Sequence, residues 1–359
     1  MTNESRLVKT FLQLVQIDSP TGDEARIAEV LAQTLRDMGL RVRRDATGNV
    51  IAALDGEGEP VLLSSHMDTV EPGRGVKPQV KDGIITSDGT TILGGDCKSG
   101  VAAILEALQC LKETGARHRP LEVVLSVGEE GGLTGARNLD LGKIKAKVGL
   151  VLDSGGPIGT IVRQAPTQDS LQVVIHGKAA HAGGEPEKGV NAIVAAADAI
   201  TQMPLGRIDE ETTANIGRIS GGIATNIIPD RVEMTGEARS LKGEKLAAQT
   251  GRMVKAIEAA AAKHGARAEI QVHHAYDAYY LPDDNPWIQH LVQVCEKIGL
   301  EPILKSSGGG SDANVYNTKG THCAVASTGM AKVHTNEECI AIADMVAAAD
   351  FVYAVVTEE

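Results

Sequence analysis

Aromatic residues and paired cysteines are both scarce in this sequence. Phe, Tyr and Trp together make up 2% of its 359 residues, so a folded core has to be built from Leu, Ile, Val and Ala. The five cysteines form no C-x-x-C pair, which argues against a zinc–thiolate site. Because an odd set of unpaired cysteines is typical of a reducing compartment, we expect a cytoplasmic protein.

Membrane-spanning and basic segments are also missing. No run of about 18 apolar residues is present, and the charged N-terminal segment does not resemble a signal peptide. The formal net charge is −12, and Lys and Arg form no cluster of the kind that makes a nucleic-acid-binding face. We therefore expect neither a membrane nor a nucleic acid as a partner.

The length and the order of the expected elements predict two domains. A single core stops growing at roughly 250–300 residues, and this chain is longer. Apolar runs and helical periodicities typical of a mixed α/β sheet occupy residues 1–167 and 277–359. Residues 168–276 follow the order β-α-β-β-α-β of a ferredoxin-like unit. The sequence thus predicts a discontinuous α/β domain with a smaller ferredoxin-like domain inserted in it.

Local patterns predict two helices near the start of the sequence. Apolar residues at helical spacing predict a helix over residues 4–17. Thr21 and Glu24 resemble a capping box that starts a second helix.

His273 and His274 are adjacent in the last strand expected for the inserted domain. Because neighbouring residues of a strand point to opposite faces, we do not expect this pair to share an ion.

Carboxylates and imidazoles follow several apolar, strand-like runs. The set consists of His66, Asp96, Glu129, Glu130, Asp153 and His334. In open α/β sheets, ligands bind at the carboxyl ends of the strands, so we expect these side chains to meet at one edge of the sheet. Asp68 lies two residues after His66, on the same side of the strand. A carboxylate in that place can hold the ring of a metal-bound histidine.

These donor types indicate a pair of metal ions. Imidazoles and carboxylates without thiolate pairs suit Zn²⁺, Co²⁺ or Mn²⁺. Five ligands are too many for one tetrahedral ion, but they suit two ions about 3.5–4 Å apart that share a carboxylate. The remaining carboxylate can act as the base that takes a proton from a bridging water. This combination is typical of a hydrolase.

Longer motifs resemble those of a known family. They are SSHMDTVEPG, GGDCKSG, GEEGGLTGA, LDSGG, GKAAHAGGEPEKGVNAI, GGSDAN and GMAKVHT. Together they resemble the M20 family of dinuclear zinc peptidases, in its peptidase T-like branch, over nearly the whole chain. The resemblance implies a phosphorylase/hydrolase-like catalytic domain with an inserted lid and dimerisation domain. It also implies two divalent ions, zinc with cobalt or manganese as alternatives, and a homodimer formed through the lid.

The resemblance implies five metal ligands. Asp96 matches the carboxylate that bridges the two ions. His66 and Asp153 would complete the first metal site. Glu130 and His334 would complete the second.

Catalytic roles follow from the same resemblance. Glu129 matches the general base that activates the bridging water, and Asp68 matches the carboxylate that orients His66. His181, in the lid, matches the histidine that stabilises the oxyanion. In the family this histidine commonly reaches into the site of the neighbouring subunit, which again implies a homodimer.

Substrate-binding residues are implied in two places. Asn226 and Arg239 match lid residues that hold the polar end of the substrate. Ser311, Asp312 and Asn314 match the glycine-rich substrate loop. The resemblance assigns no individual roles within that loop.

Two positions depart from the family pattern. Cys97 stands where the family usually has Asp, and Gly308 stands where its tripeptidases have Arg. A nucleophilic Cys97 would need a nearby base, but the histidines in motifs are already assigned, so we favour a structural role over a nucleophile or an additional ligand. Without the arginine we do not expect strict tripeptide specificity. The resemblance further implies a cis peptide bond between Asp96 and Cys97.

The expected function is the metal-dependent hydrolysis of an amide bond in short peptides, as an aminopeptidase or tripeptidase-like enzyme. One alternative is an M20-type amidohydrolase, either an N-acyl amino acid deacylase or a carboxypeptidase. Another is a homologue that binds peptides without cleaving them. That homologue would lack a ligand or the base, whereas this sequence has all of them.

Overall fold

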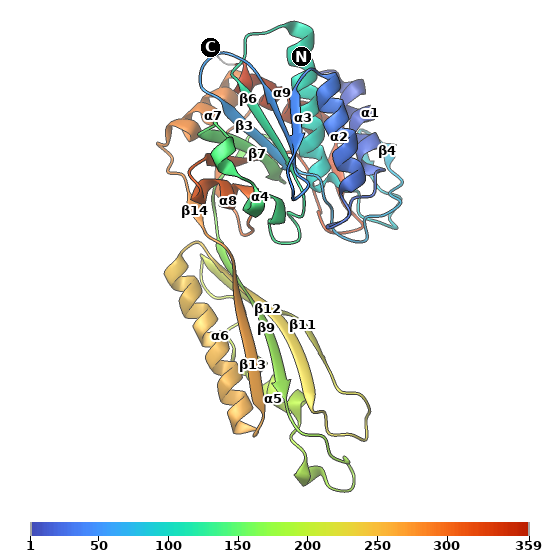
Figure 1. The fold of residues 1–359 in the computed structure, drawn as a ribbon, viewed down its shortest axis with the longest axis vertical. Coiled ribbons are helices and arrows are strands. Elements are labelled where there is room, and N and C mark those ends of the chain that lie inside the picture. The colour runs from blue at the N-terminus through green and yellow to red at the C-terminus, as the bar shows by residue number, and fades with distance from the viewer. Residues whose placement is uncertain (1, 358–359) are drawn as a thin grey trace. The chain divides into compact units, whose positions relative to one another are not determined.

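The computed structural model describes residues 2–357, which form two compact units (Figure 1). The first unit contains the described residues up to Gln164, then Tyr280–Ser307, and those from Ser311 onward. The second contains Ala165–Tyr279 together with Gly308–Gly310. The sequence prediction placed the two boundaries after residues 167 and 276 and did not foresee the second unit's glycine segment.

The first unit is built on a mixed sheet. Its strands run in the order β1-β2-β6-β3-β7-β16-β8, and β15 pairs with β8. Their bounds are β1 Arg41–Arg44, β2 Val50–Leu54, β6 Leu121–Ser126, β3 Val61–His66, β7 Val148–Ser154, β16 His322–Ser327, β8 Thr160–Ala165 and β15 Ile303–Ser306. The pairs β3–β6, β3–β7 and β7–β16 are parallel, so their carboxyl ends lie at one edge of the sheet. Short β14 (Tyr279–Tyr280) lies where the chain returns from the second unit.

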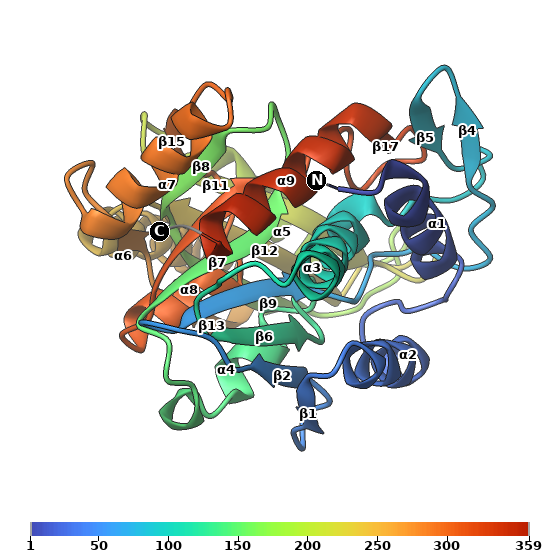
Figure 2. The ribbon, with the colours of Figure 1, turned by 90° about the horizontal axis from the view of Figure 1, so that it is seen from above.

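Helices cover the strands, as expected of an α/β domain. Their bounds are α1 Glu4–Val15, α2 Ala25–Asp37, α3 Gly95–Thr114, α4 Thr134–Asn138, α7 Pro286–Lys297, α8 Asp312–Thr318 and α9 Ile342–Val356, with a 3₁₀ turn at Leu141–Lys143. Helices α3 and α9 pack against each other and α1 packs against both, while α4 lies across the strands from α3 in Figure 2. A separate small sheet has the order β17-β5-β4, from Cys339–Ala341, Ile84–Thr86 and Gln79–Lys81.

Helix α1 confirms the prediction from helical spacing. Asn3 precedes it and accepts a hydrogen bond from the backbone N–H of Arg6, which caps the helix start. The buried residues Leu7, Phe11 and Leu14 lie on one face. This apolar stripe packs against α3 and α9.

The capping box predicted at Thr21 and Glu24 is wrong. Helix α2 begins at Ala25 and has no side-chain cap. Thr21 instead donates its hydroxyl to Asp68, and Glu24 accepts the backbone N–H of Gly128. Both side chains therefore bind partners that are distant in sequence.

The second unit has the ferredoxin-like order that the sequence predicts, with one short strand added after its first helix. Its elements are β9 Thr167–His176, α5 Ala192–Gln202, β10 Gly206–Arg207, β11 Thr212–Gly221, β12 Arg231–Ser240, α6 Gly243–Lys263 and β13 Arg267–Tyr276, with a 3₁₀ turn at Pro186–Lys188. The antiparallel sheet runs β10-β11-β12-β9-β13. Alternate residues of β9, including Leu171, Val173 and Ile175, are buried in a core shared with α5 and α6. The period-two alternation thus identifies the face that the helices cover.

No helix within residues 2–357 combines the length and the apolar character that crossing a bilayer requires.

His274, at the end of β13, links separate parts of the second unit. Its Nδ1 lies 3.0 Å from Asp169 Oδ1, and its Nε2 lies 3.1 Å from Asp277 Oδ1. Asp169 also accepts the hydroxyl of Thr250 in α6. Hydrogen bonding to Asp169, followed by Asp277, raises the pKa of His274. A histidine whose pKa is raised on folding stabilises the fold below its unfolded pKa, and this stabilisation is lost as pH rises through the folded pKa.

We therefore expect His274→Gln to lower the free energy of unfolding by about 0.5 kcal/mol at pH 5.5, the scale of an exposed ion pair, and by less at pH 9. Urea unfolding at both pH values measures this difference. His273→Gln, one residue away, is the matched control, because it leaves the contacts of His274 with Asp169 and Asp277 in place. An equal loss for His274→Gln at the two pH values would contradict the assignment.

Candidate active site

The carboxyl ends of the parallel strands bring the expected side chains together. His66 is the last residue of β3 and pairs in register with Ser126, the last residue of β6. The loop after β6 therefore carries Glu129 and Glu130 to the same edge. Asp153 lies one residue before the end of β7.

Asp96 lies between two histidines that come from different segments. Its Oδ1 is 3.2 Å from His66 Nε2, and its Oδ2 is 3.2 Å from His334 Nε2. The same His66 atom is 3.6 Å from Asp153 Oδ1, and the same His334 atom is 2.8 Å from Glu130 Oε1. The arrangement therefore consists of two clusters that share one carboxylate.

The donor atoms of both clusters fit divalent metal ions. Three groups of side chains each have ligand atoms that all lie within 4.8 Å of one another. The first group is His66, Asp96, Cys97 and Asp153; the second is His66, Glu129 and Glu130; the third is Asp96, Glu130 and His334. Imidazole nitrogens and carboxylate oxygens are the donors that Zn²⁺, Co²⁺ and Mn²⁺ accept. The donor set predicted from the sequence is thus assembled at one place.

His66 and His334 shift the pKa of Asp96, and carboxylates in turn shift the pKa values of the two histidines. Hydrogen bonds to Asp96 and Glu130 raise the pKa of His334 to about 10. Burial alone would lower the pKa of His66, but hydrogen bonds to neighbouring carboxylates raise it well above its ordinary value. Burial alone would raise the pKa of Asp96, yet the two histidines together lower it. Each shift thus favours the charged form of the group, because groups of opposite charge lie within hydrogen-bonding distance.

The pKa values of two further carboxylates, Glu129 and Asp153, are raised. Burial, followed by the nearby charge of Asp153, raises the pKa of Glu129 well above its ordinary value. Burial likewise raises the pKa of Asp153 to about 7. Both shifts disfavour the charged form of the carboxylate, and a nearby cation would act in the opposite direction.

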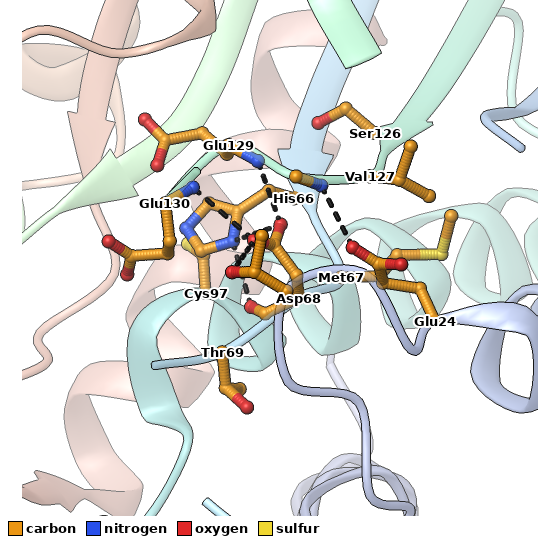
Figure 3. A network of polar contacts seen from close by, with 12 residues as sticks. Glu24, His66, Met67, Asp68, Thr69, Cys97, Ser126, Val127, Glu129 and Glu130 are labelled. Carbon is orange, nitrogen blue, oxygen red and sulfur yellow. Dashed lines mark hydrogen bonds and ion pairs between the residues drawn. The ribbon is translucent and has the colours of Figure 1, made fainter. Parts of the chain in front are cut away.

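The loop that carries Glu129 and Glu130 is fixed through its backbone. The N–H groups of four consecutive residues, 127–130, donate to side-chain oxygens, and Figure 3 shows the bonds to Glu24 and Asp68. Asn49 accepts the first at 3.1 Å and Glu24 accepts the second at 3.1 Å. Asp68 accepts the third and fourth at 3.0 and 3.3 Å. The roles of Asn49 and Glu24 were not predicted, because each contact spans tens of residues in the sequence.

Asp68 holds His66 mainly through its backbone. The Nδ1 atom of His66 is 3.0 Å from the Asp68 carbonyl oxygen and 3.5 Å from its carboxylate. The carboxylate of Asp68 is engaged by Thr21 and by the loop amides of Glu129 and Glu130. The orienting group nearest to the ring is therefore a main-chain carbonyl, which the sequence pattern did not distinguish from the carboxylate.

The loop that carries His334 is closed by its own main chain. Ala331 and Cys339 exchange two backbone hydrogen bonds, at 2.9 and 3.0 Å. His334 itself has φ of +62°, a left-handed conformation that costs roughly 1–2 kcal/mol in a residue with a side chain. The closed loop holds this conformation and so directs the imidazole toward Asp96 and Glu130.

Cys97 lies beside the first cluster but is fully buried. Its thiol donates to the Leu152 carbonyl, and burial raises its pKa well above the ordinary value. A reactive cysteine is instead partly exposed and has a lowered pKa. The Asp96–Cys97 peptide is cis, as the resemblance implied.

The predicted residues of the lid lie in the second unit, where the structure brings two of them together. The backbone N–H of Ala182, next to His181, donates to the Asn226 carbonyl, and both predicted residues are exposed. His181 Nδ1 accepts the N–H groups of Gly183 and Gly184, at 3.1 and 3.0 Å. The proton of the neutral ring is therefore assigned to Nε2, which is a hydrogen-bond donor.

Arg239 lies elsewhere in the second unit and is paired. Its guanidinium donates from Nε and Nη2 to the two carboxylate oxygens of Glu237, both at 2.9 Å. Glu237 also accepts from Gln168. The expected contact between Arg239 and substrate stays a prediction, and it would have to compete with this fork-like pair.

The residues of the predicted substrate loop are buried in the first unit. Ser311 and Asn314 form the capping box of α8. Asp312 accepts the hydroxyl of Ser126 and is 1% exposed. Burial raises the pKa of Asp312 to about 6. Substrate contact by these three residues stays a prediction, and the contacts that they make here support the loop.

A model of the peptidase family M20/M25/M40 matches residues 62–358, which include all five predicted metal ligands. The chain belongs to this family. Its M20 architecture is shared with solved structures over nearly the full length of both chains.

Individual relatives place the chain in the peptidase T-like branch. It is 30% identical to peptidase T of Vibrio parahaemolyticus, over 94% of each chain. The solved structure of aminopeptidase PepT from Bacillus cereus is 45% identical, with a TM-score of 0.88 over 99% of this chain and 98% of that one. A tripeptidase structure from Staphylococcus aureus is 40% identical, with a TM-score of 0.94 over the same shares. This M20 chain is therefore a metallopeptidase.

The backbone contact of Glu24 can be tested by a pair of substitutions. Glu24 Oε1 accepts the N–H groups of both Gly22 and Gly128. Glu24→Ala leaves these donors without their partner, and we expect a loss of about 1–3 kcal/mol in the free energy of unfolding.

Glu24→Gln is the matched control, because one amide oxygen can still accept both donors. Its free energy of unfolding in urea should lie close to that of the unaltered protein. If Glu24→Gln lost as much stability as Glu24→Ala, the carboxylate charge rather than the hydrogen bonds would be the important feature.

Proposed function

We propose that this chain is a two-metal aminopeptidase that cleaves short peptides. The observation that carries the proposal is the position of Asp96, whose two oxygens each lie 3.2 Å from the Nε2 atom of a different histidine. In this proposal Asp96 would help to hold both of two divalent ions, zinc or otherwise cobalt or manganese. His66 with Asp153 and His334 with Glu130 would supply the other ligands of the two sites.

Bound divalent ions would polarise the scissile carbonyl and make an attacking water more acidic. Glu129 is the proposed base, because its carboxylate lies beside His66 and Glu130 and is the one that this proposal does not use as a metal ligand. It takes the proton of the attacking water and returns it to the leaving amine. Asp68 and Glu24 keep the loop of Glu129 in place through backbone N–H groups.

His181 is the proposed oxyanion donor. Its Nδ1 is engaged by two backbone N–H groups, so Nε2–H is available for a developing negative charge. Because His181 belongs to the second unit, we propose a homodimer formed through that unit, in which His181 serves the partner's site. The exposed apolar residues Ile219 and Ile223 of the same unit support an interface there.

The proposed substrate is a short peptide with a free amino end, in a cytoplasmic enzyme. The relatives named aminopeptidase PepT and tripeptidase support this choice. Gly308 has no atom near the place of a Cβ, and the arginine of tripeptidases is absent there. We therefore propose cleavage of dipeptides as well as tripeptides. The five free cysteines agree with a reducing compartment.

A peptide panel tests the proposed function. Protein stripped with a chelator is supplied with Zn²⁺, Co²⁺ or Mn²⁺ and then with di-, tri- and N-acylated peptides. We expect metal-dependent release of the first residue, and a block when the amino end is acylated. Release of only the acyl group would favour an N-acyl amino acid deacylase. A folded, metal-loaded protein that cleaves nothing would favour a binding role.

Neighbouring glutamates should differ in their effects. Glu129→Gln removes the base and should lower kcat by about 10²–10⁴-fold while two ions per chain remain bound. Glu130→Gln removes a ligand and should lower the affinity for one ion. Metal content by mass spectrometry of the native protein, measured with kcat, separates the two cases. Loss of metal from Glu129→Gln would reject its assignment as base.

The partner-site role of His181 can be tested by mixing inactive variants. His181→Ala and Glu129→Gln should each lower kcat by about 10²-fold or more. Co-expressed, they should recover about a quarter of the kcat, because half of the dimers are mixed and each mixed dimer carries one intact site of two. No recovery from a verified mixed dimer would place His181 in the site of its own subunit.

A further inference from the structure

Glu338 is a completely buried carboxylate for which no role has been assigned. It lies four residues after His334 and directly before β17. Its side chain is 0% exposed, and it forms no ion pair among the described residues. A buried carboxylate without a cation needs other hydrogen-bond donors.

Three backbone N–H groups supply those donors. Glu338 Oε2 accepts from Leu93 and Gly94, both at 2.8 Å, and Oε1 accepts from Asp96 at 2.9 Å. These residues belong to the turn that leads into α3, where Gly94 has φ of +77° and Asp96 is not helical. The turn therefore lacks helical partners for these amides, and Glu338 replaces them.

Gly95 leaves room for this carboxylate. An ideal Cβ at Gly95 would lie 3.1 Å from Glu338 Oε1, which is closer than ordinary contact. The backbone φ of Gly95 lies outside the left-handed region, so the absence of a side chain is the relevant feature. The sequence GGDC thus permits the carboxylate to approach the turn from outside.

We propose that Glu338 is a positioning residue that fixes Asp96 relative to His334, and so sets the geometry of the shared-carboxylate metal site. It links the two segments directly, because its own backbone belongs to the closed loop of His334 while its side chain holds the backbone of Asp96. This inference rests on the proposed two-metal function. The distance from His334 Nε2 to Asp96 Oδ2 is 3.2 Å, and displacement of either segment would change it.

The substitution Glu338→Gln tests the proposal, because an amide cannot accept hydrogen bonds from both of its ends. We expect a loss of about 10–100-fold in affinity for one of two ions, the range seen when a residue supporting metal ligands is changed. The affinity is measured with Zn²⁺ alone, by competition with a chromophoric chelator at a temperature where the variant is folded. High Zn²⁺ should then restore part of kcat.

Glu106→Gln is the matched control. Glu106 is also buried, and it accepts the backbone N–H of Asn3 and the side chain of Arg6, away from the metal ligands. This change should lower Tm without lowering the affinity for Zn²⁺. Wild-type affinity in folded Glu338→Gln, or an equal loss in Glu106→Gln, would overturn the proposal.

If Glu338→Gln does not fold, a second variant, Gly95→Ala, tests the same proposal. Gly95→Ala should displace the carboxylate by a few tenths of an ångström and weaken binding of one ion about threefold. Gly251→Ala, where no atom lies within 4 Å of the new Cβ, is its control. Unchanged affinity in Gly95→Ala would reject the proposal. Because Zn²⁺ binding is measured without substrate, failure of the peptide assay alone would count against the proposed function and not against Glu338.

Discussion

The shared position of Asp96 between two imidazoles is the interaction on which the rest of the site depends. Each carboxylate oxygen lies 3.2 Å from a different histidine nitrogen. Around this pair, Glu129 and Asp153 lie at the strand ends, and removal from water raises their pKa values. Carboxylates that lie close together and away from water need protons or cations nearby. The site is therefore electrostatically prepared for metal ions.

Five acidic residues in and around the site divide into two kinds by what they bind. Asp96 and Glu130 face imidazoles, whereas Asp68, Glu24 and Glu338 accept backbone N–H groups. The second kind holds the irregular segments that carry the first. Buried backbone N–H groups of irregular segments need partners as much as those of helices do. Carboxylates supply these partners where regular secondary structure has ended.

The fold was predictable from the sequence because its signals are local. Alternating burial in β9 and the helical stripe of α1 agree with the patterns read from the sequence. Strand ends could be recognised from apolar runs followed by charged residues, and these ends identified the cluster around His66 and Asp153. The capping box at Thr21 was misassigned because Asp68, distant in sequence, competes for the same hydroxyl.

The sequence by itself determined the α/β class, the inserted ferredoxin-like unit and the identity of the donor atoms, since periodicity and residue type are properties of short segments. Only the tertiary structure decided which carboxylates accept backbone amides. Glu338 illustrates the difference, because its partners lie more than 240 residues earlier in the chain. Hydrogen bonds of this kind depend on how loops are closed and packed, and no spacing within one segment records them.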